Sequence, residues 1–318
     1  MARPRRSRVH PSLRAAWTRR RAGRGFAYAD ESGSPVRAAG DLERIRSLAI
    51  PPAWQHVRIA ASPRARLQAS GIDAAGRTQY LYNAAWRSRQ EARKFTRALE
   101  LAHRLPQMRR AVTRDLRGRR GARNQALAAA VRLVDRTGIR VGGRRYARTN
   151  GTFGVITVQR RHVTLDGDRI AFKFPGKSGA VWGVDLRDAD LARYLAALPD
   201  GGPRRPAIGY DDGAGFQRIG AAALNDYVRQ IAGIGVSVKD LRTWRGTAAA
   251  AESLARSLSA GIPADVAWKR AVEAAAAWLN NTPAVARSSY VDPRLLDAYR
   301  HGEAATTDRA IAALLDRG

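Results

Sequence analysis

The spacing of hydrophobic and polar positions changes along the chain and separates a strand-rich part from a helical part. Over residues 25–86, short apolar stretches alternate with Gly, Pro and Asp, which is typical of strands joined by turns. This pattern predicts two or three strands and a short helix near residues 42–47. From about residue 87, apolar positions recur at helical spacing. We therefore expect a domain boundary near residues 86–92.

The second part is predicted to be mainly helical with one small sheet. Residues 126–139 predict a helix that ends at Gly138, because glycine readily adopts the left-handed conformation of a helix cap. Alternation over residues 151–186 predicts three strands, with Val155 and Thr157 in the first of them. Further helices are expected over 188–198, 221–232, 247–260, 265–281 and 282–290. The expected fold class is α+β: a small β-rich N-terminal domain over 25–90 and a larger, mainly helical domain with a three-stranded sheet over 91–318.

Charge points to a polyanionic partner. The 318 residues include 57 Lys+Arg and 27 Asp+Glu, so the formal charge is 57 − 27 = +30. Residues 1–24 hold nine Arg and no acidic residue, which predicts a basic arm without fixed structure, but the remainder still carries 30 − 9 = +21. Binding of cations to phosphates releases counterions, so double-stranded DNA is the expected partner. No apolar run approaches the ~20 residues of a membrane span, and we expect a cytoplasmic, nucleoid-associated protein.

Elimination narrows the chemistry to arginine, lysine and tyrosine. The chain has no Cys, which excludes disulfides, thiolate metal sites and cysteine nucleophiles. Its five His form no HExxH motif, its acidic residues form no Asp-x-Asp run, and its PGKSG turn joins two predicted strands rather than a strand and a helix. Arginine matches phosphate oxygens with a fixed fork of donors, and cations favour the phenolate form of a tyrosine. These residue types are suited to phosphoryl transfer without a metal.

The chain offers such residues in a definite order. They are Arg140 in TGIRVGGRRY, Lys177 in FPGKSG, Arg242 in KDLRTW, and Asn281 and Tyr290 in LNNTPAVARSSY. The set resembles the active site of type IB DNA topoisomerases of the short poxvirus-like and bacterial kind, and the likeness extends over nearly all of residues 25–300. The resemblance implies the catalytic fold shared by tyrosine recombinases and type IB topoisomerases. It also implies a monomeric clamp around duplex DNA that needs no cofactor, ATP or metal.

The resemblance assigns a role to each of these residues. Tyr290 would attack a backbone phosphate and form a 3′-phosphotyrosyl link, while Arg140, Arg242 and Asn281 would bind the non-bridging oxygens. Lys177 would protonate the leaving 5′-oxygen. Rotation of the free end followed by religation would relax positive and negative supercoils. The implied DNA-contacting residues are Gln79, Tyr80, Tyr82, Tyr146 and Lys239.

Several alternatives stay open at this point. Asn281 stands where the poxviral pattern has His, which affects the expected rate rather than the reaction type, and the neighbouring Asn280 could take its place. Tyr299 competes with Tyr290, and Tyr80 and Tyr82 could be half-buried strand aromatics. A tyrosine recombinase would usually show His-x-x-Arg where this chain has Lys-Asp-Leu-Arg, and this difference favours a topoisomerase. A nucleoid protein that only coats DNA would share the positive charge.

Overall fold

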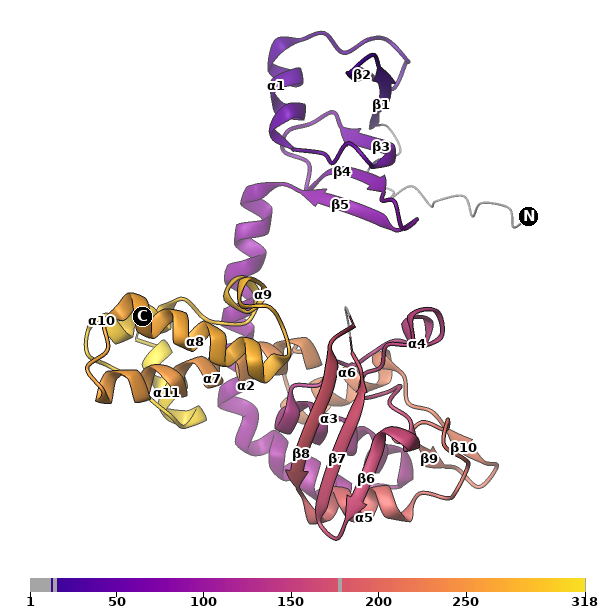
Figure 1. Ribbon diagram of the computed structural model, residues 1–318, viewed down its shortest axis with the longest axis vertical. Helices are drawn as coiled ribbons and strands as arrows, with labels where there is room; N and C mark the ends of the chain where they lie inside the picture. Colours follow the sequence, from indigo (N-terminus) through magenta and orange to yellow (C-terminus); the bar gives the residue numbers. More distant parts are fainter. Residues whose placement is uncertain (1–12, 14–15, 177–178, 318) are drawn as a thin grey trace. The chain divides into compact units, whose positions relative to one another are not determined.

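The fold is described by a computed structural model that covers residue 13 and residues 16–176 and 179–317. The chain divides into two compact units, an N-terminal unit (residues 1–92) and a C-terminal unit (residues 93–318) (Figure 1). Strands dominate the first unit and helices the second, so the predicted α+β fold class is confirmed. Within the described part of the chain, no helix is both long enough and apolar enough to cross a membrane.

The N-terminal unit is built on a five-stranded antiparallel sheet with the order β2-β1-β3-β4-β5. Its strands are β1 (Ala16–Ala22), β2 (Gly25–Ala29), β3 (Gln55–Ala60), β4 (Leu67–Ile72) and β5 (Thr78–Tyr82), and its helix is α1 (Ala39–Ser47). Ile59 and Ala60 are neighbours in β3 and therefore point to opposite faces of the sheet. Ile59 packs with Ile45 of α1, and Ala60 packs with Leu13 and Ala16, so the small domain buries an apolar cluster on each face.

The expectation of an unstructured arm over residues 1–24 is wrong for the part that the structure describes. Residues 16–22 form β1, which lies between β2 and β3, while residues 1–12 and 14–15 lie outside the described residues. Arg19 explains how so basic a segment joins a sheet. Its guanidinium lies 4.0 Å from the centre of the Phe26 ring and donates to the carbonyl of Trp54 at 2.7 Å and to that of Pro51 at 3.1 Å. The charge therefore satisfies backbone acceptors inside the domain.

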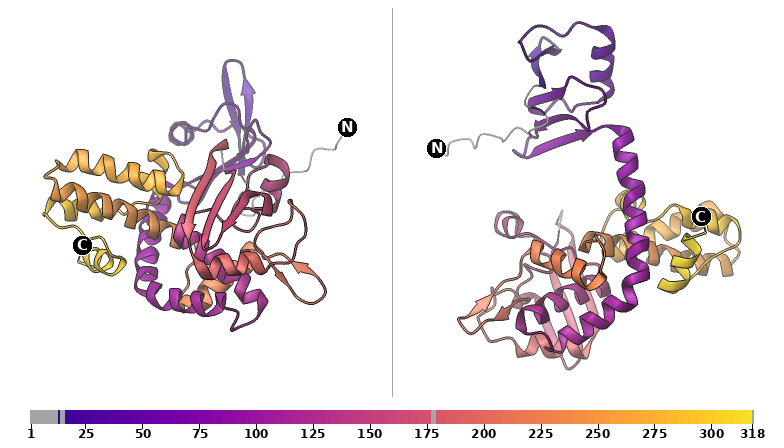
Figure 2. Two further views of the ribbon diagram at one scale, coloured as in Figure 1. Left: turned by 60° about the horizontal axis from the view of Figure 1, so that its bottom comes forward. Right: turned by 180° about the vertical axis from the view of Figure 1, so that it is seen from behind.

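The C-terminal unit combines a three-stranded sheet with a set of helices around one large apolar core. The chain enters it through α2 (Ala84–Leu116), which begins in the N-terminal unit. The sheet has the antiparallel order β6-β7-β8, and α7 and α8 lie side by side, as Figures 1 and 2 show. The elements are α3 (Ala122–Thr137), α4 (Arg144–Asn150), the 3-10 helix η2 (Arg160–His162), β6 (Val163–Asp166), β7 (Arg169–Pro175), β8 (Val181–Arg187), α5 (Ala189–Ala197), β9 (Tyr210–Asp211), β10 (Phe216–Gln217), α6 (Ala221–Ala232), α7 (Val238–Ser259), α8 (Ala264–Leu279), α9 (Pro283–Ser289), α10 (Arg294–Arg300) and α11 (Asp308–Leu315).

Residues 151–162 do not form the strand that their alternation predicts. The segment turns back on the loop after α3 instead: the Val155 amide donates to the Arg140 carbonyl at 2.8 Å, and the Ile156 amide donates to the Val141 carbonyl at 3.0 Å. Gly154 makes this approach possible, because a Cβ atom there would lie 2.4 Å from the Arg140 carbonyl oxygen. The two segments hold each other, and the loop that carries Arg140 is thereby fixed.

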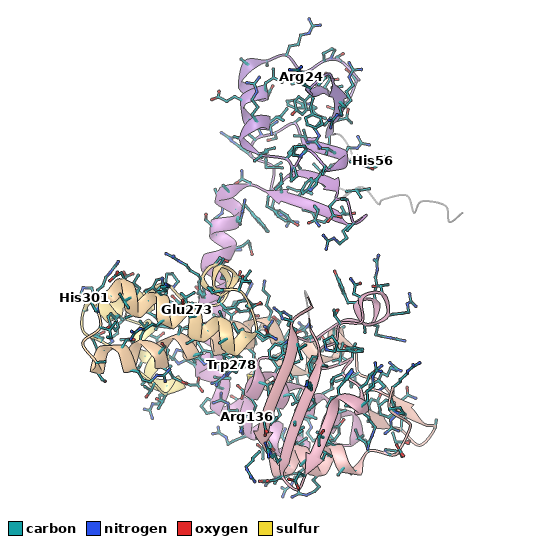
Figure 3. The ribbon with its side chains drawn as sticks, in the orientation of Figure 1. Arg24, His56, Arg136, Glu273, Trp278 and His301 are labelled. Atoms are coloured by element: carbon teal, nitrogen blue, oxygen red, sulfur yellow. The ribbon has the colours of Figure 1, made fainter. Side chains whose placement is uncertain are left out.

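The end of α3 agrees with the prediction from the sequence. Gly138 caps the helix with a φ of 68°, in the left-handed region that favours glycine. A side chain at this position would also collide with a neighbour, since a Cβ atom would lie 2.6 Å from Cζ3 of Trp278 on α8 (labelled in Figure 3). Glycine therefore lets α3 end directly against the C-terminal end of α8.

Candidate active site

The helix α7 supports the tyrosine at position 290. The helix begins nine residues earlier than predicted, at Val238, because Ser237 and Asp240 form a capping box at its N-terminus. Arg242 and Gly246 are then four residues apart and lie on the same side of the helix, and Thr247 directly follows Gly246. The Thr247 hydroxyl donates to the carbonyl of Tyr290 at 3.0 Å. Gly246 leaves room for this segment, since a Cβ atom there would lie 2.9 Å from the Tyr290 Cβ.

Tyr290 directly follows the short helix α9. Thr282 caps the start of this helix, where its hydroxyl accepts from the Val285 amide, and Pro283 occupies the first turn. At the other end, the Tyr290 amide donates to the Ala286 carbonyl at 2.9 Å. The half-buried phenol reaches Arg242, whose Nη1 donates to the Tyr290 Oη at 3.2 Å. The phenol oxygen therefore lies beside a guanidinium cation.

Arg242 is buried, and backbone carbonyls orient its guanidinium. It is 6% exposed, its Nε donates to the Gly138 carbonyl at 2.8 Å, and its Nη2 donates to the Leu279 carbonyl at 3.4 Å. Burial lowers the pKa of Arg242 to about 10; the phenol of Tyr290 opposes this shift, and the charge of Arg140 adds to it. The side chain is still a cation at neutral pH, so a fixed positive charge faces the tyrosine.

Arg140 and Asn281 extend the site beside Arg242. Arg140 is half-buried, and burial lowers its pKa, an effect that Tyr290 opposes. Its Nη2 donates to Oδ1 of Asn281 and, at 3.5 Å, to the carbonyl of Asn280. The Nδ2 of Asn281 is buried and has no hydrogen-bond partner within the described residues. A buried amide donor without a partner is uncommon, and this one is available to an anionic oxygen.

The structure separates the two neighbouring asparagines. Asn280 ends α8 in the left-handed conformation, with a φ of 47°, and its Nδ2 donates to the carbonyl of Val181 in β8 at 3.2 Å. The side chain of Asn281 lies instead beside Arg140. Of the two, Asn281 is the one that joins the cluster of Arg140, Arg242 and Tyr290.

Lys177 and Tyr299 are the two remaining candidates from the sequence, and neither is part of the described cluster. Lys177 falls between β7 and β8 in the chain and lies outside the described residues, so its place relative to Tyr290 stays a prediction. Tyr299 is buried in α10, and its hydroxyl donates to the Ile262 carbonyl, which removes it from the cluster. No group of three or more His, Asp or Glu side chains suited to a metal ion occurs in the parts of the chain that the structure covers.

Comparison with known protein families gives separate evidence on what this chain is. A family model described as "Eukaryotic DNA topoisomerase I, catalytic core" matches residues 83–310, which is well over half of the chain. The chain belongs to the type IB DNA topoisomerase family. A second family model, "Bacterial DNA topoisomerase IB, N-terminal domain", matches residues 25–73 of the N-terminal unit. The family predicted from the sequence is therefore confirmed.

Viral type IB enzymes are among the relatives of this chain. The DNA topoisomerase 1B of Acanthamoeba polyphaga mimivirus is 28% identical over 293 residues, which cover 89% of this chain and 87% of the viral protein. The DNA topoisomerase 1B of vaccinia virus (strain Copenhagen) and the DNA topoisomerase I of monkeypox virus are each 24% identical over 183 residues. Those alignments cover 56% of this chain and 54% of each viral protein. The likeness to the mimivirus protein thus extends through both units.

The residues that the type IB resemblance marks as DNA contacts are distributed over both units. In the C-terminal unit, Tyr146 on α4 is 61% exposed, and Lys239 is exposed in the first turn of α7. In β5 of the N-terminal unit, Tyr80 is 39% exposed, whereas Tyr82 packs against the apolar cluster and stacks on Trp86 at 4.8 Å between ring centres. Tyr82 is therefore a half-buried strand aromatic, which was the alternative to a DNA contact for this strand.

Gln79 in β5 is ordered by a turn of the N-terminal unit. Its Nε2 donates to Oδ2 of Asp73 at 2.8 Å, and Arg77 makes a 2.8 Å ion pair with the same carboxylate. The hydrogen bond from the Arg77 side chain is the largest of the interactions that lower the pKa of Asp73, to about 2. The carboxylate is therefore ionised at neutral pH and fixes the direction of the glutamine side chain. A DNA contact through Gln79 stays a prediction.

Sequence reasoning missed Thr247, which holds the backbone of Tyr290. The hydroxyl of Thr247 also accepts from the Asp292 amide at 3.2 Å, so one side chain connects the residues on both sides of Val291. No sequence motif marks Thr247: it lies five residues after Arg242, a spacing that does not put two residues on one helical face, and its role comes from its contacts with the backbone.

The two asparagines give a matched test of the site. Asn281→Ala is expected to slow single-turnover cleavage of a duplex oligonucleotide by about 10²-fold, because it removes both the acceptor for Arg140 and the available amide donor. Asn280→Gly is the control: glycine tolerates the positive φ, and only the contact with Val181 is lost. We expect that variant to cleave at a rate close to wild type. Equal losses in the two variants would contradict the assignment of Asn281.

Proposed function

We propose that this protein relaxes positively and negatively supercoiled DNA by transient cleavage of one strand. The observation that carries the proposal is the 3.2 Å hydrogen bond from Arg242 to the phenol oxygen of Tyr290, with Arg140 and Asn281 beside it. This cluster supplies a nucleophile and several fixed donors within one small site, as transfer of a phosphoryl group requires. Family membership supports the same reaction class.

The proposed chemistry is an exchange of esters at phosphorus. The phenol of Tyr290 releases its proton to water, and its oxygen bonds to a backbone phosphorus as the bond from phosphorus to the 5′-oxygen breaks. Arg140, Arg242 and Asn281 are suited to hold the non-bridging oxygens, where negative charge increases in the transition state. Lys177, by the family resemblance, gives a proton to the leaving 5′-oxygen. The 3′-phosphotyrosyl ester conserves the energy of the broken bond, so religation is the same exchange in reverse.

In this proposal, fixed guanidinium groups supply the positive charge that a divalent metal ion supplies in many enzymes that act on phosphates. Arg242 is oriented by two backbone carbonyls before any DNA binds, so no reorganisation of this group is needed during the reaction. Its cation can stabilise negative charge on the attacking oxygen and on the phosphate in turn. Neither ATP nor a divalent metal is expected to be required.

Plasmid relaxation in EDTA without ATP tests the proposed function. The protein is expected to relax plasmids of either supercoil sign, and denaturation during the reaction should leave it attached to a 3′ end with a free 5′-hydroxyl. Attachment to a 5′ end would contradict the polarity. DNA binding with no nicking would support a coat protein instead, and products that require two paired sites would support a recombinase.

A further inference from the structure

Lys94 is a buried cation to which the proposed reaction gives no role. The chain has 57 Lys+Arg residues, of which only Lys94, Lys173, Lys177, Lys239 and Lys269 are lysines. Lys94 stands on α2, within the C-terminal unit, and is 9% exposed. Its Nζ donates to the carbonyl of Ser288 at 2.7 Å and lies 4.5 Å from the centre of the Phe95 ring. A buried ammonium is stabilised by hydrogen bonds, and the Ser288 carbonyl is one of the groups that hold it.

The carbonyl that Lys94 contacts belongs to the last turn of α9. The final carbonyls of a helix have no partner within the helix and carry the negative end of its dipole, so a cation is stabilised there. Ser288 is two residues before Tyr290, and the amides of Tyr290 and Val291 both donate to the Ala286 carbonyl in the same turn. A movement of the Ser288 carbonyl would therefore move the backbone that carries the phenol.

A second contact, one turn further along α2, joins this helix to the start of α7. Nε of Arg97 lies 3.4 Å from Oδ1 of Asp240, the residue that closes the capping box at the start of α7. Because α7 carries Arg242, the same helix contacts the element that holds the phenol and the element that holds its cationic neighbour. Thr247 binds the carbonyl of Tyr290 from the α7 side. Thr247 of α7 thus holds the carbonyl of Tyr290 itself, and Lys94 of α2 holds the carbonyl of Ser288, two residues before it.

We propose that Lys94 is a positioning residue that sets the phenol of Tyr290 against Arg242. This inference rests on the proposed function, because it assumes that Tyr290 is the nucleophile. Lys94 does not contact the phenol itself. It acts through the Ser288 carbonyl, and small displacements of a nucleophile from its attack position have large effects on rate.

Lys94→Met tests the proposal, since methionine keeps much of the apolar stem and removes the donors and the charge. We expect single-turnover cleavage of a duplex oligonucleotide to slow by about 10- to 100-fold, with little change in the dissociation constant for that duplex. Hydrogen exchange followed by mass spectrometry should show faster exchange in the peptide covering residues 283–290 than in the wild type. Lys269→Met is the matched control, because it removes the same charge from an exposed position on α8.

Each outcome decides for or against the role of Lys94. Slower cleavage with local deprotection and unchanged DNA affinity supports it. Cleavage at the wild-type rate, or a rate loss that Lys269→Met matches, overturns it. Deprotection spread over the whole C-terminal unit would also overturn it, because that result indicates a general loss of stability. If the wild type itself forms no covalent adduct, the proposed function fails, and the role of Lys94 fails with it. If the wild type forms the adduct and Lys94→Met cleaves at the same rate, only the role of Lys94 is contradicted.

Discussion

Tyr290→Phe is expected to lose plasmid relaxation and the covalent protein–DNA adduct completely, while it still binds duplex DNA. The substitution removes one oxygen, which is the atom that would bond to phosphorus. It leaves the ring beside the Arg242 guanidinium, 5.2 Å away, and keeps the backbone contact with Thr247. The fold should therefore be preserved. Gel assays of relaxation in EDTA, and trapping of the adduct with denaturant, measure the loss.

Tyr299→Phe is the matched control for this experiment. It also removes a tyrosine hydroxyl, but that hydroxyl is buried in α10 and bonds to the Ile262 carbonyl, away from the cluster. We expect a loss of about 1 kcal/mol in the free energy of unfolding from the missing hydrogen bond, with relaxation retained. Relaxation by Tyr290→Phe, or loss of the adduct only in Tyr299→Phe, would show that the nucleophile has been assigned to the wrong residue.

Arg242→Gln is expected to slow cleavage and religation alike, by about 10²- to 10³-fold, which is the effect of removing one preorganised donor from an anion site. Both directions share one transition state, so they should fall together. Glutamine has no charge and cannot donate at once to the Gly138 carbonyl, the Leu279 carbonyl and the Tyr290 hydroxyl. We therefore also expect a loss in the free energy of unfolding. Single-turnover cleavage and religation rates, with the urea midpoint of each variant, separate the two effects.

Arg256→Gln controls for the loss of an arginine from α7, because Arg256 is exposed in the last turn of the same helix. It should react at the wild-type rate.

The pH profile of the wild type adds a second readout. Arg242 has a pKa lowered to about 10, so its charge, and with it the cleavage rate, should decline as the pH rises through that value. Native stability together with a rate loss under threefold in Arg242→Gln would contradict its proposed role.

Much of the site could be predicted because its members lie in short, distinctive segments. Arg140, Arg242, Asn281 and Tyr290 were selected from the sequence, and the structure brings them into one cluster. Most of the predicted helices of the C-terminal unit were also correct, since their apolar faces repeat with helical spacing. The helices follow from local information, which a linear pattern contains, whereas the four residues were selected through the type IB resemblance and their catalytic roles stay predictions.

The failures depend on tertiary contacts. Val155 was assigned to a strand from its alternation, but residues 154–156 pair with the loop after α3 through an approach that only glycine allows. Thr247 and Lys94 are ordinary residues in sequence and matter because they bind backbone carbonyls near Tyr290. A side chain that acts through a distant carbonyl leaves no motif, because its partner can be any residue type.

The place of β1 within the sheet of the N-terminal unit has a practical consequence. A shorter protein that starts at residue 25 removes the charged segment but also removes the strand between β2 and β3, together with Leu13 and Ala16, which are buried. β2 would lose its neighbour, and both β2 and β3 would present unpaired edges that invite aggregation. Poor solubility of such a truncated protein would report on a broken sheet rather than on the missing positive charge.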